Sequence, residues 1–442
     1  MPNDQIARVV LGMAVTIALA VLAAHPKVRQ FERRLGLTVL VASGLPFLIL
    51  GAVFRLESVG ILTDRVLHDL KPAFDFGLGW VGFVVGAQLD IRRLERLPSR
   101  LGPVIALLAF TPTLLTVIAC SLILLSLGVF PGDGLVRDTI VLAACAAASA
   151  PGNLKLLLRH ARPAAVQLVI EITRIDQVAA LGIFAFVAIT FRPAAGIATW
   201  VLPRSAWLLV TLGVGTLLGA LTYILIWRVR DEIERTTILI GGVALAAGTA
   251  GYLAVSVPVV CAIAGALMMN LPLPDAEPMR KTLATVERPL YLLFLFILGA
   301  SWQPGQWEGW VLALGFVLAR NYGKLVASRW AVRVGPEGLP SAPAMAVALM
   351  PESPIAIVVI FSAATLYSGY PSSDVLWVIH AVIIGSILTD VTVQIVQRRQ
   401  AARIGIDETY PGAKRNEETH PRPPRARRGG GEKEPKSKGV ET

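Results

Sequence analysis

The chain has 442 residues, of which 55% are hydrophobic and only 16% are charged, and it carries a net charge of +11. A soluble domain has about a quarter of its residues charged, so this composition excludes an ordinary water-soluble protein. Apolar runs of about 20 residues recur along the chain, and each is long enough to cross ~30 Å of hydrocarbon. The ten-residue alternating segments of a β-barrel are absent, so helices must cross the bilayer. The composition predicts an all-α membrane protein.

The apolar runs predict about thirteen spanning helices. The first is not expected to be a signal peptide, because its apolar part is too long and no good cleavage site follows it. Only Ser256, Val257 and Pro258 separate two later runs. We keep these runs as two helices, because merging them would invert every loop on one side of the pair. The expected spans are 5–24, 35–54, 72–89, 101–128, 136–158, 164–191, 203–227, 236–256, 257–271, 287–302, 308–333, 341–367 and 374–397.

Lys and Arg side chains indicate the orientation of these spans. With the C-terminal tail placed in the cytoplasm, the cytoplasmic loops hold far more Lys and Arg than the external loops. This asymmetry is the positive-inside pattern. We therefore expect a multi-pass protein of the cell (inner) membrane, with its N-terminus outside and its C-terminus cytoplasmic.

The last part of the chain has a different composition. Residues 399–442 are rich in Lys, Arg, Pro, Gly and Glu and have few apolar residues, so they cannot bury enough surface to fold. We expect a transmembrane domain over 1–398 and a disordered basic tail over 399–442. The positive charge then indicates topology and contact with the lipid bilayer, and not nucleic-acid binding.

No cofactor is expected. Cys120, Cys145 and Cys261 lie in apolar spans without paired spacing, which argues against a disulfide framework and a zinc site. No Walker A sequence occurs, so the usual signature of an ATP-driven pump is missing. The spans also lack a Ser/His/Asp or paired-carboxylate constellation. We expect a protein that is not an enzyme and that holds no metal beyond a transported monovalent cation.

Two spans carry helix breakers near their middle, at Pro151 in 147–153 and at Pro351 and Pro354 in 350–354. Proline removes a backbone donor and clashes with the preceding turn, so each helix should unwind and leave backbone groups in need of partners. Interrupted helices at corresponding places in two halves are typical of transporters built from inverted repeats. We expect two inverted six-helix repeats with discontinuous helices five and twelve. Two ordinary proline kinks are the alternative.

Ionisable residues inside a span are energetically expensive, which makes them candidates for function. Asp176 is the deepest in the sixth span, whereas Glu171 and Arg174 lie nearer the basic loop. Glu171 and Asp176 are five residues apart and fall on different faces of the helix, so they are not a carboxylate pair. Burial favours the neutral form of a carboxyl group, so Asp176 can exchange a proton for a cation. A permanent structural ion pair with Arg174 or Arg320 is the alternative.

Arg320 and Lys324 of the eleventh span are one helical turn apart and share a face. There they could neutralise Glu352 or the carbonyl ends of the broken helices. A structural and a catalytic role are equally open for this pair.

Four stretches, in this order, resemble motifs of the monovalent cation:proton antiporters, which include bacterial sodium/proton exchangers and the membrane part of potassium efflux systems. Residues 83–90 end a helix with Phe, Gly and Asp before a basic loop. Residues 171–176 have the spacing of the family's Glu-x-x-x-Asn-Asp stretch, whose final Asp is its ion-binding carboxylate. Residues 295–301 resemble a Phe and Gly pattern of the tenth helix, and 320–324 resemble the Arg-x-x-Gly-Lys of the eleventh.

This resemblance covers nearly all of 5–397. It implies a homodimer, with a scaffold domain and a mobile core domain that carries the ion by an elevator-like movement. The sequence departs from the family at three places. Ile175 stands where the family has Asn or a second Asp, 149–151 read Ser-Ala-Pro where Thr-Asp-Pro is common, and Glu352 with Pro354 replace an Arg and Glu pattern.

The leading hypothesis is a secondary transporter that exchanges a monovalent cation, Na⁺ or K⁺, for protons by alternating access. Asp176 is the expected shared site, Ser149 and Asn153 are candidate ion ligands, and Arg320 is the expected charge partner. Further candidate charge partners are Lys324, Glu352, Glu171 and Arg174. One alternative is a sodium-coupled symporter of a small organic anion, favoured if Arg174 or Arg320 faces a substrate carboxylate. Another is a non-transporting membrane sensor or scaffold whose basic tail binds anionic lipid or a partner.

Overall fold

The computed structural model describes residues 14, 44–56, 62–95, 98–150, 163–192, 202–272, 276–302, 304–367 and 373–403. Every regular element in these ranges is a helix. Contacts divide the chain into two units, 1–395 and 396–442, and the helix packing belongs to the first.

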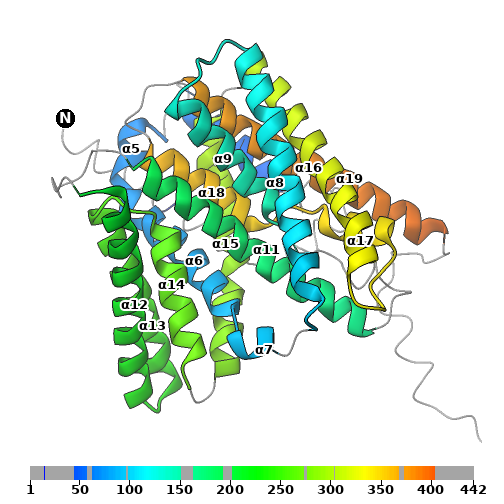
Figure 1. The fold of residues 1–442 in the computed structure, drawn as a ribbon. Helices are drawn as coiled ribbons and strands as arrows, with labels where there is room; N and C mark the ends of the chain where they lie inside the picture. Colours follow the sequence, from blue (N-terminus) through cyan, green and yellow to red (C-terminus); the bar gives the residue numbers. More distant parts are fainter. Residues whose placement is uncertain are drawn as a thin grey trace, which may run out of the picture. The chain divides into compact units, whose positions relative to one another are not determined.

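The helices follow one another along the chain as Figure 1 shows. They are α4 (Leu45–Arg55), α5 (Asp64–Asp69), α6 (Lys71–Gln88), α7 (Ile91–Glu95), α8 (Leu101–Ser126), α9 (Asp133–Ala147), α11 (Pro163–Thr190), α12 (Arg204–Arg228), α13 (Glu232–Tyr252), α14 (Val257–Asn270), α15 (Ala276–Ser301), α16 (Trp307–Val334), α17 (Ala342–Leu349), α18 (Pro354–Leu366) and α19 (Ser373–Arg403).

Most of these helices begin and end within a few residues of the expected spans. The break between α13 and α14 confirms that the apolar stretch 236–271 forms two helices. α15 begins well before the expected residue 287. Its first part carries Glu277 and Lys281, which are good helix formers but lower the local hydropathy, so the apolar run marks only the second part of this helix. The count of thirteen spans and the inverted repeats stay predictions.

Length and composition identify four described helical segments that could cross a membrane: Leu101–Ser126, Pro163–Thr190, Arg204–Arg228 and Val375–Val393. Shorter apolar helices are Leu45–Arg55, Val257–Asn270, Pro289–Ser301 and Pro354–Leu366. The first expected span, 5–24, lies outside the described residues apart from Ala14.

The last helix, α19, ends beyond residue 398, where the transmembrane domain was predicted to end. α19 continues to Arg403, through a stretch of Gln, Arg and Ala that favours helix whatever its hydropathy. The remaining residues of the predicted tail, 404–442, lie outside the described part of the chain.

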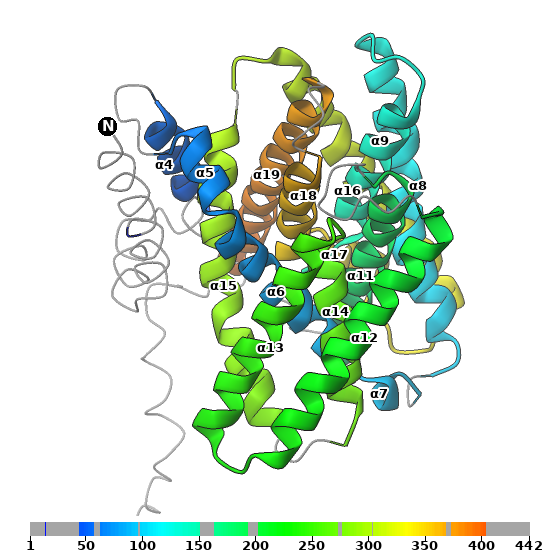
Figure 2. The same cartoon turned by 90° about the vertical axis from the view of Figure 1, so that its left-hand side faces the viewer.

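One group of helices consists of α6, α12, α13 and α14, which lie side by side in Figure 2. Glycines permit the closest of these contacts. A Cβ added to Gly86 of α6 would lie 1.9 Å from the Ala262 carbonyl oxygen of α14, and one on Gly82 would lie 2.2 Å from that of Pro258. Small residues at such crossings let helix backbones approach, which is how helices pack in the absence of a hydrophobic driving force.

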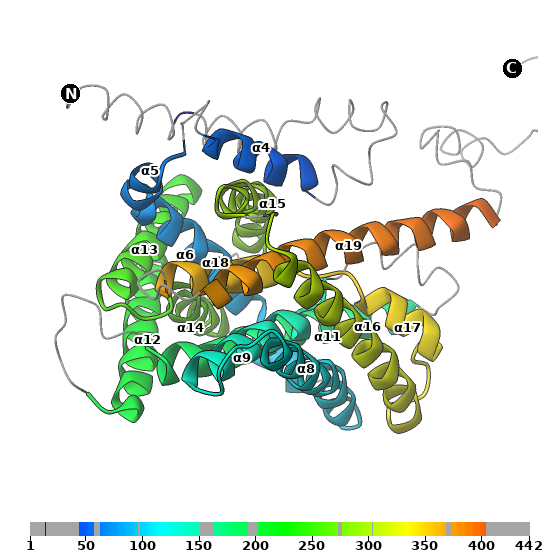
Figure 3. The same cartoon turned by 90° about the horizontal axis from the view of Figure 1, so that it is seen from above.

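A second group consists of α8, α9 and α16, with α16 packed along α8. A Cβ added to Gly323 of α16 would lie 2.5 Å from the Pro112 Cα of α8. α11 contacts members of both groups, and the view from above in Figure 3 shows it between them. Side chains of α11 can therefore contact helices of both groups.

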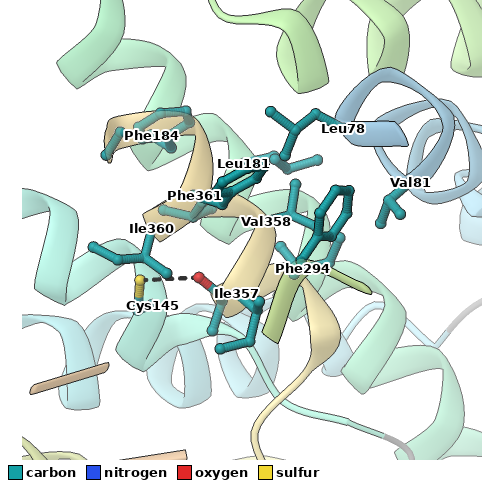
Figure 4. Close-up of a cluster of buried hydrophobic side chains, with 14 of the residues drawn as sticks. Leu78, Val81, Cys145, Leu181, Phe184, Phe294, Ile357, Val358, Ile360 and Phe361 are labelled. Atoms are coloured by element: carbon teal, nitrogen blue, oxygen red, sulfur yellow. Dashed lines mark hydrogen bonds between the residues drawn. The ribbon is translucent and has the colours of Figure 1, made fainter. Parts of the chain in front are cut away.

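The buried apolar core is shared by helices that are distant in sequence. Figure 4 shows Leu78 of α6, Phe184 of α11, Phe294 of α15 and Phe361 of α18 in one cluster. The rings of Phe294 and Phe361 have centroids 5.2 Å apart. Outward-facing positions are also apolar, and Leu209 of α12 is 69% exposed. A surface of this kind suits lipid and not water.

Candidate functional site

The two segments in which helix breaks were predicted cross and pair with each other. α9 ends at Ala147 and residues 148–150 are not helical, while the rest of the expected span, 151–158, lies outside the described residues. α17 and α18 are separated by a non-helical segment over 350–353. Ser149 and Glu352 form an isolated antiparallel bridge, and the Ala150 amide donates to the Pro351 carbonyl at 3.0 Å. Each break thus supplies partners for backbone groups that the other has freed from its helix, as membrane depth requires.

Arg320 of α16 holds this crossing together. Its side chain is fully buried, and its guanidinium donates to the Met350 carbonyl at 2.5 Å and to the Ala148 carbonyl at 2.9 Å. A longer bond of 3.4 Å reaches the Pro351 carbonyl. One positive charge thus faces carbonyl groups from both breaks, which is the favourable sign for the C-terminal end of a helix.

Asp176 of α11 lies beside the crossing and is fully buried. Its Oδ2 atom accepts from Ser149 Oγ at 2.9 Å and from Lys324 Nζ at 3.0 Å. Its Oδ1 atom is buried without a hydrogen-bond partner in the described structure. The neighbouring Gln177 donates to the Ser149 carbonyl at 3.4 Å, so α11 holds the first break by two side chains.

Lys324 of α16 completes the group and is also fully buried. Besides the Asp176 carboxylate, its ammonium donates to the Leu108 carbonyl of α8 and the Ala147 carbonyl of α9, each at 3.1 Å. Three oxygens from three different helices therefore surround a single positive charge.

The direct ion pair with Asp176 is made by Lys324, one of the further candidate charge partners, and not by Arg320. The guanidinium of Arg320 is occupied by the carbonyls of the crossing, and it acts on Asp176 only through longer-range electrostatic attraction. The alternative pair with Arg174 is not formed either. Arg174 binds Glu171 at 2.7 Å on a less buried part of α11.

Glu352 lies in the second break and is 6% exposed. Neither of its carboxylate oxygens makes a well-formed hydrogen bond, although Ser386 of α19 is close enough to interact. Arg320 attracts this carboxylate, and Asp390 of α19 repels it while accepting a hydrogen bond from the Glu352 amide. Sequence reasoning missed Asp390, although an acidic residue inside the last apolar span was the signal that could have identified it.

Of the two candidate ion ligands, Ser149 lies against Asp176, while Asn153 lies outside the described residues. The guanidinium groups of Arg174 and Arg320, one of which would have to face the substrate carboxylate in an organic-anion symporter, are both bonded to protein groups. The site consists of a fully buried carboxylate paired with a lysine ammonium that also binds two backbone oxygens. Oxygen ligands of this kind suit hard cations.

Comparisons with known proteins agree with this arrangement. Residues 8–396 match the family model described as sodium/hydrogen exchanger, transmembrane. The fold is similar to a structure of the sodium proton antiporter MjNhaP1 from Methanocaldococcus jannaschii at pH 8, with a TM-score of 0.60. The two sequences are 14% identical, and the match covers 90% of this chain and 98% of that one. An electron-microscopy structure of the same antiporter gives a TM-score of 0.57 and 15% identity over 91% and 99% of the two chains. No match is found among curated proteins. Because the family model covers most of the sequence, the chain belongs to the sodium/hydrogen exchanger family of multi-pass membrane proteins, which exchange a cation for protons.

Proposed function

We propose that Asp176 is the site that the cation and the proton share, and that the Lys324 ammonium occupies this site when the transported cation is absent. The observation that carries the proposal is the 3.0 Å ion pair between two fully buried side chains, with Ser149 Oγ on the same carboxylate oxygen. One carboxylate cannot hold both a lysine ammonium and a second cation at this distance. Binding of a cation therefore requires a positive charge or a proton to leave.

The surroundings of Lys324 support replacement of its ammonium by a transported ion. If the Lys324 ammonium loses a proton to solvent and the neutral amine withdraws, it frees the Asp176 carboxylate and the carbonyl oxygens of Leu108 and Ala147. These are a negative oxygen and two neutral oxygens, which can replace part of the hydration shell of Na⁺ or K⁺. The cation then has the same charge as the ammonium, so the buried region keeps its charge balance.

The crossing of the two breaks supports alternating access around this site. Ser149 and Glu352 pair through their backbones, and Arg320 binds carbonyls on both sides of the pairing. The ligands are therefore tied together and can move as one body, and α11, which carries Asp176, also contacts α6, α12 and α14. Discontinuous helices at membrane depth are typical of transporters that move a fixed site between two openings.

The experiment is a transport assay on the full-length protein in proteoliposomes with an imposed proton gradient. Addition of Na⁺ or K⁺ should collapse the gradient with the unchanged protein and not with Asp176→Asn. Glu171→Gln is the matched control, because Glu171 lies on the same helix, half-buried and paired with Arg174. Equal exchange by the unchanged protein and Asp176→Asn would refute the site, and no response of the unchanged protein to either cation would refute the antiport.

We further infer that the chain is a homodimer in the cell membrane, with its N-terminus outside and its C-terminus in the cytoplasm. The excess of Lys and Arg in alternate loops supports the orientation, and the family resemblance supports the dimer. Single cysteines introduced at Gly132, between α8 and α9, and at Arg230, between α12 and α13, test the orientation. A membrane-impermeant thiol reagent applied to intact cells should label the first position and not the second.

A further inference from the structure

A groove of about 260 Å³ runs between α11 on one side and α6, α12 and α14 on the other. Its walls are almost entirely apolar. Small residues of α11, Gly182 and Ala185, leave the space open, and Leu208 and Leu212 of α12 form part of the opposite wall. Nothing lies within 4 Å of the place that a Cβ on Gly182 would occupy.

The groove opens toward the lipid-facing surface. Gly182 is exposed, and Leu208 and Leu212 are 46% and 43% exposed. An apolar hollow that is open to hydrocarbon will hold hydrocarbon, because water would find no polar partner on these walls. The volume is small for a whole ligand and suits one flexible chain.

At one end the groove continues into a narrower cleft lined by Arg192, Trp207 and Ser256. Ile189, Thr211 and two other residues line both spaces. The Arg192 guanidinium lies 3.5 Å from the centroid of the Trp207 ring and donates to the Leu253 carbonyl at 2.8 Å. Its Nε atom is buried without a hydrogen-bond partner, and among the described residues Arg192 makes no ion pair.

Ser256 adds a second group that suits an anion. It is 4% exposed, its hydroxyl has no hydrogen-bond partner, and it stands at the N-cap of α14 without capping that helix. The N-terminal end of a helix carries a partial positive charge and attracts phosphate groups. One end of the apolar groove therefore combines three features. These are the positive charge of Arg192, the Ser256 hydroxyl that lacks a hydrogen-bond partner, and the start of α14.

We propose that this groove and its polar end bind an anionic phospholipid, with one acyl chain between α11 and α12 and the phosphate beside Arg192 and Ser256. Arg192 lies two residues past Thr190, the last residue of α11, so it lies where the hydrocarbon gives way to headgroups. The cleft is narrow, and the phosphate lies at its rim. We choose a lipid as the occupant because the groove is apolar over its length and positive at one end. An anionic phospholipid has the complementary pattern, an apolar chain with a negative charge at one end.

The position of the lipid has a consequence for transport, and this consequence rests on the proposed function. α11 carries Asp176, and the acyl chain lies between this helix and the helices opposite. Movement of α11 past α12 and α14 would deform the groove. The bound lipid therefore favours one arrangement of these helices over the other.

Lipid retention is tested by native mass spectrometry of the purified full-length protein mixed with phosphatidylglycerol or with phosphatidylcholine. The unchanged protein should retain phosphatidylglycerol about tenfold more strongly, because both lipids carry the phosphate but the choline ammonium of phosphatidylcholine offsets its attraction to Arg192. Arg192→Gln should lose this preference, whereas Arg192→Lys should keep most of it. Gly182→Leu fills the groove and should lose retention of both lipids.

Two matched controls separate the site from the general surface. Arg204→Gln removes an exposed arginine at the start of α12, and Gly213→Leu adds a side chain at an exposed α12 glycine with nothing within 4 Å. Both should retain lipid as the unchanged protein does. The proposal is overturned if the two lipids are retained equally by the unchanged protein, if Arg192→Gln keeps the preference, or if Gly182→Leu binds as well as Gly213→Leu. Because mass spectrometry measures binding and not transport, these outcomes are independent of the Asp176 assignment.

Discussion

Replacing Lys324 by Gln should destabilise the protein strongly and make its stability depend on the cation. The ammonium is fully buried and binds the Asp176 carboxylate at 3.0 Å. Its removal leaves a buried negative charge without its partner, which costs about 3–5 kcal/mol. The loss of stability should lie near the lower end of this range, since the Gln amide can still donate to the Leu108 or Ala147 carbonyl. Lys324 donates to both of these carbonyls in the unchanged protein.

The double variant Lys324→Gln, Asp176→Asn should be more stable than Lys324→Gln alone, because it removes both charges. The coupling between the two sites should be about 0.5–3 kcal/mol. Na⁺ or K⁺ should also stabilise the single variant more than the unchanged protein, because the cation no longer has to displace the ammonium. At a free concentration about a hundred times the Kd, this stabilisation is about 2.7 kcal/mol.

The assay is thermal unfolding of the purified protein in detergent, followed by tryptophan fluorescence with and without the cation. Lys71→Gln is the control, because it breaks a 2.7 Å ion pair with Asp75 whose lysine side chain is 42% exposed. The Asp75 side chain is only 10% exposed, but the lysine reaches solvent, so the loss of this pair should cost less than the loss of the fully buried one. The reasoning is refuted if the single and double variants unfold at the same temperature, or if the cation shifts Lys324→Gln no more than the unchanged protein.

Three further predictions follow from the site and the packing. Arg320→Lys should lower the unfolding temperature and the exchange rate, because a lysine cannot reproduce the guanidinium bonds to both breaks; unchanged rates in proteoliposomes would contradict this. Gly86→Leu should prevent folding, since its Cβ would lie 1.9 Å from a carbonyl oxygen of α14. Gly241→Leu is the control, because no atom lies within 4 Å of its added Cβ, and this variant should yield normal protein on gel filtration. If the proton and the cation share Asp176 as proposed, the apparent KM for the cation should rise as the pH falls. A KM independent of pH would exclude a shared site.

Much of the helical layout could be predicted from hydropathy and from the prolines. α6 was expected over 72–89 and is Lys71–Gln88. α9 ends at Ala147, shortly before Pro151, and a non-helical segment that contains Pro351 separates α17 from α18 as proposed. These features depend on local chemistry, namely the length of an apolar run and the missing donor of proline. The polar first part of α15 was missed, because hydropathy detects contact with lipid and not helix formation.

The partners at the site could not be predicted in the same way. Arg320 and Lys324 share a face of α16, and sequence alone cannot decide which of them meets Asp176. That choice depends on the tertiary packing of α16 against the two breaks. In this packing, the guanidinium of Arg320 binds the backbone carbonyls of the breaks, and Lys324 is left to pair with Asp176. The pairing of Ser149 with Glu352 joins segments about two hundred residues apart and leaves no periodic signal in the sequence.

The most direct test of Asp176 as the shared site is proton release from the purified protein on cation addition, measured with a pH indicator in weakly buffered detergent solution. If the cation displaces a proton from Asp176, or displaces the Lys324 ammonium and this group then loses a proton to solvent, addition of Na⁺ or K⁺ should release protons from the unchanged protein and from Glu171→Gln, but not from Asp176→Asn. Proton release from Asp176→Asn equal to that from the unchanged protein would contradict the account.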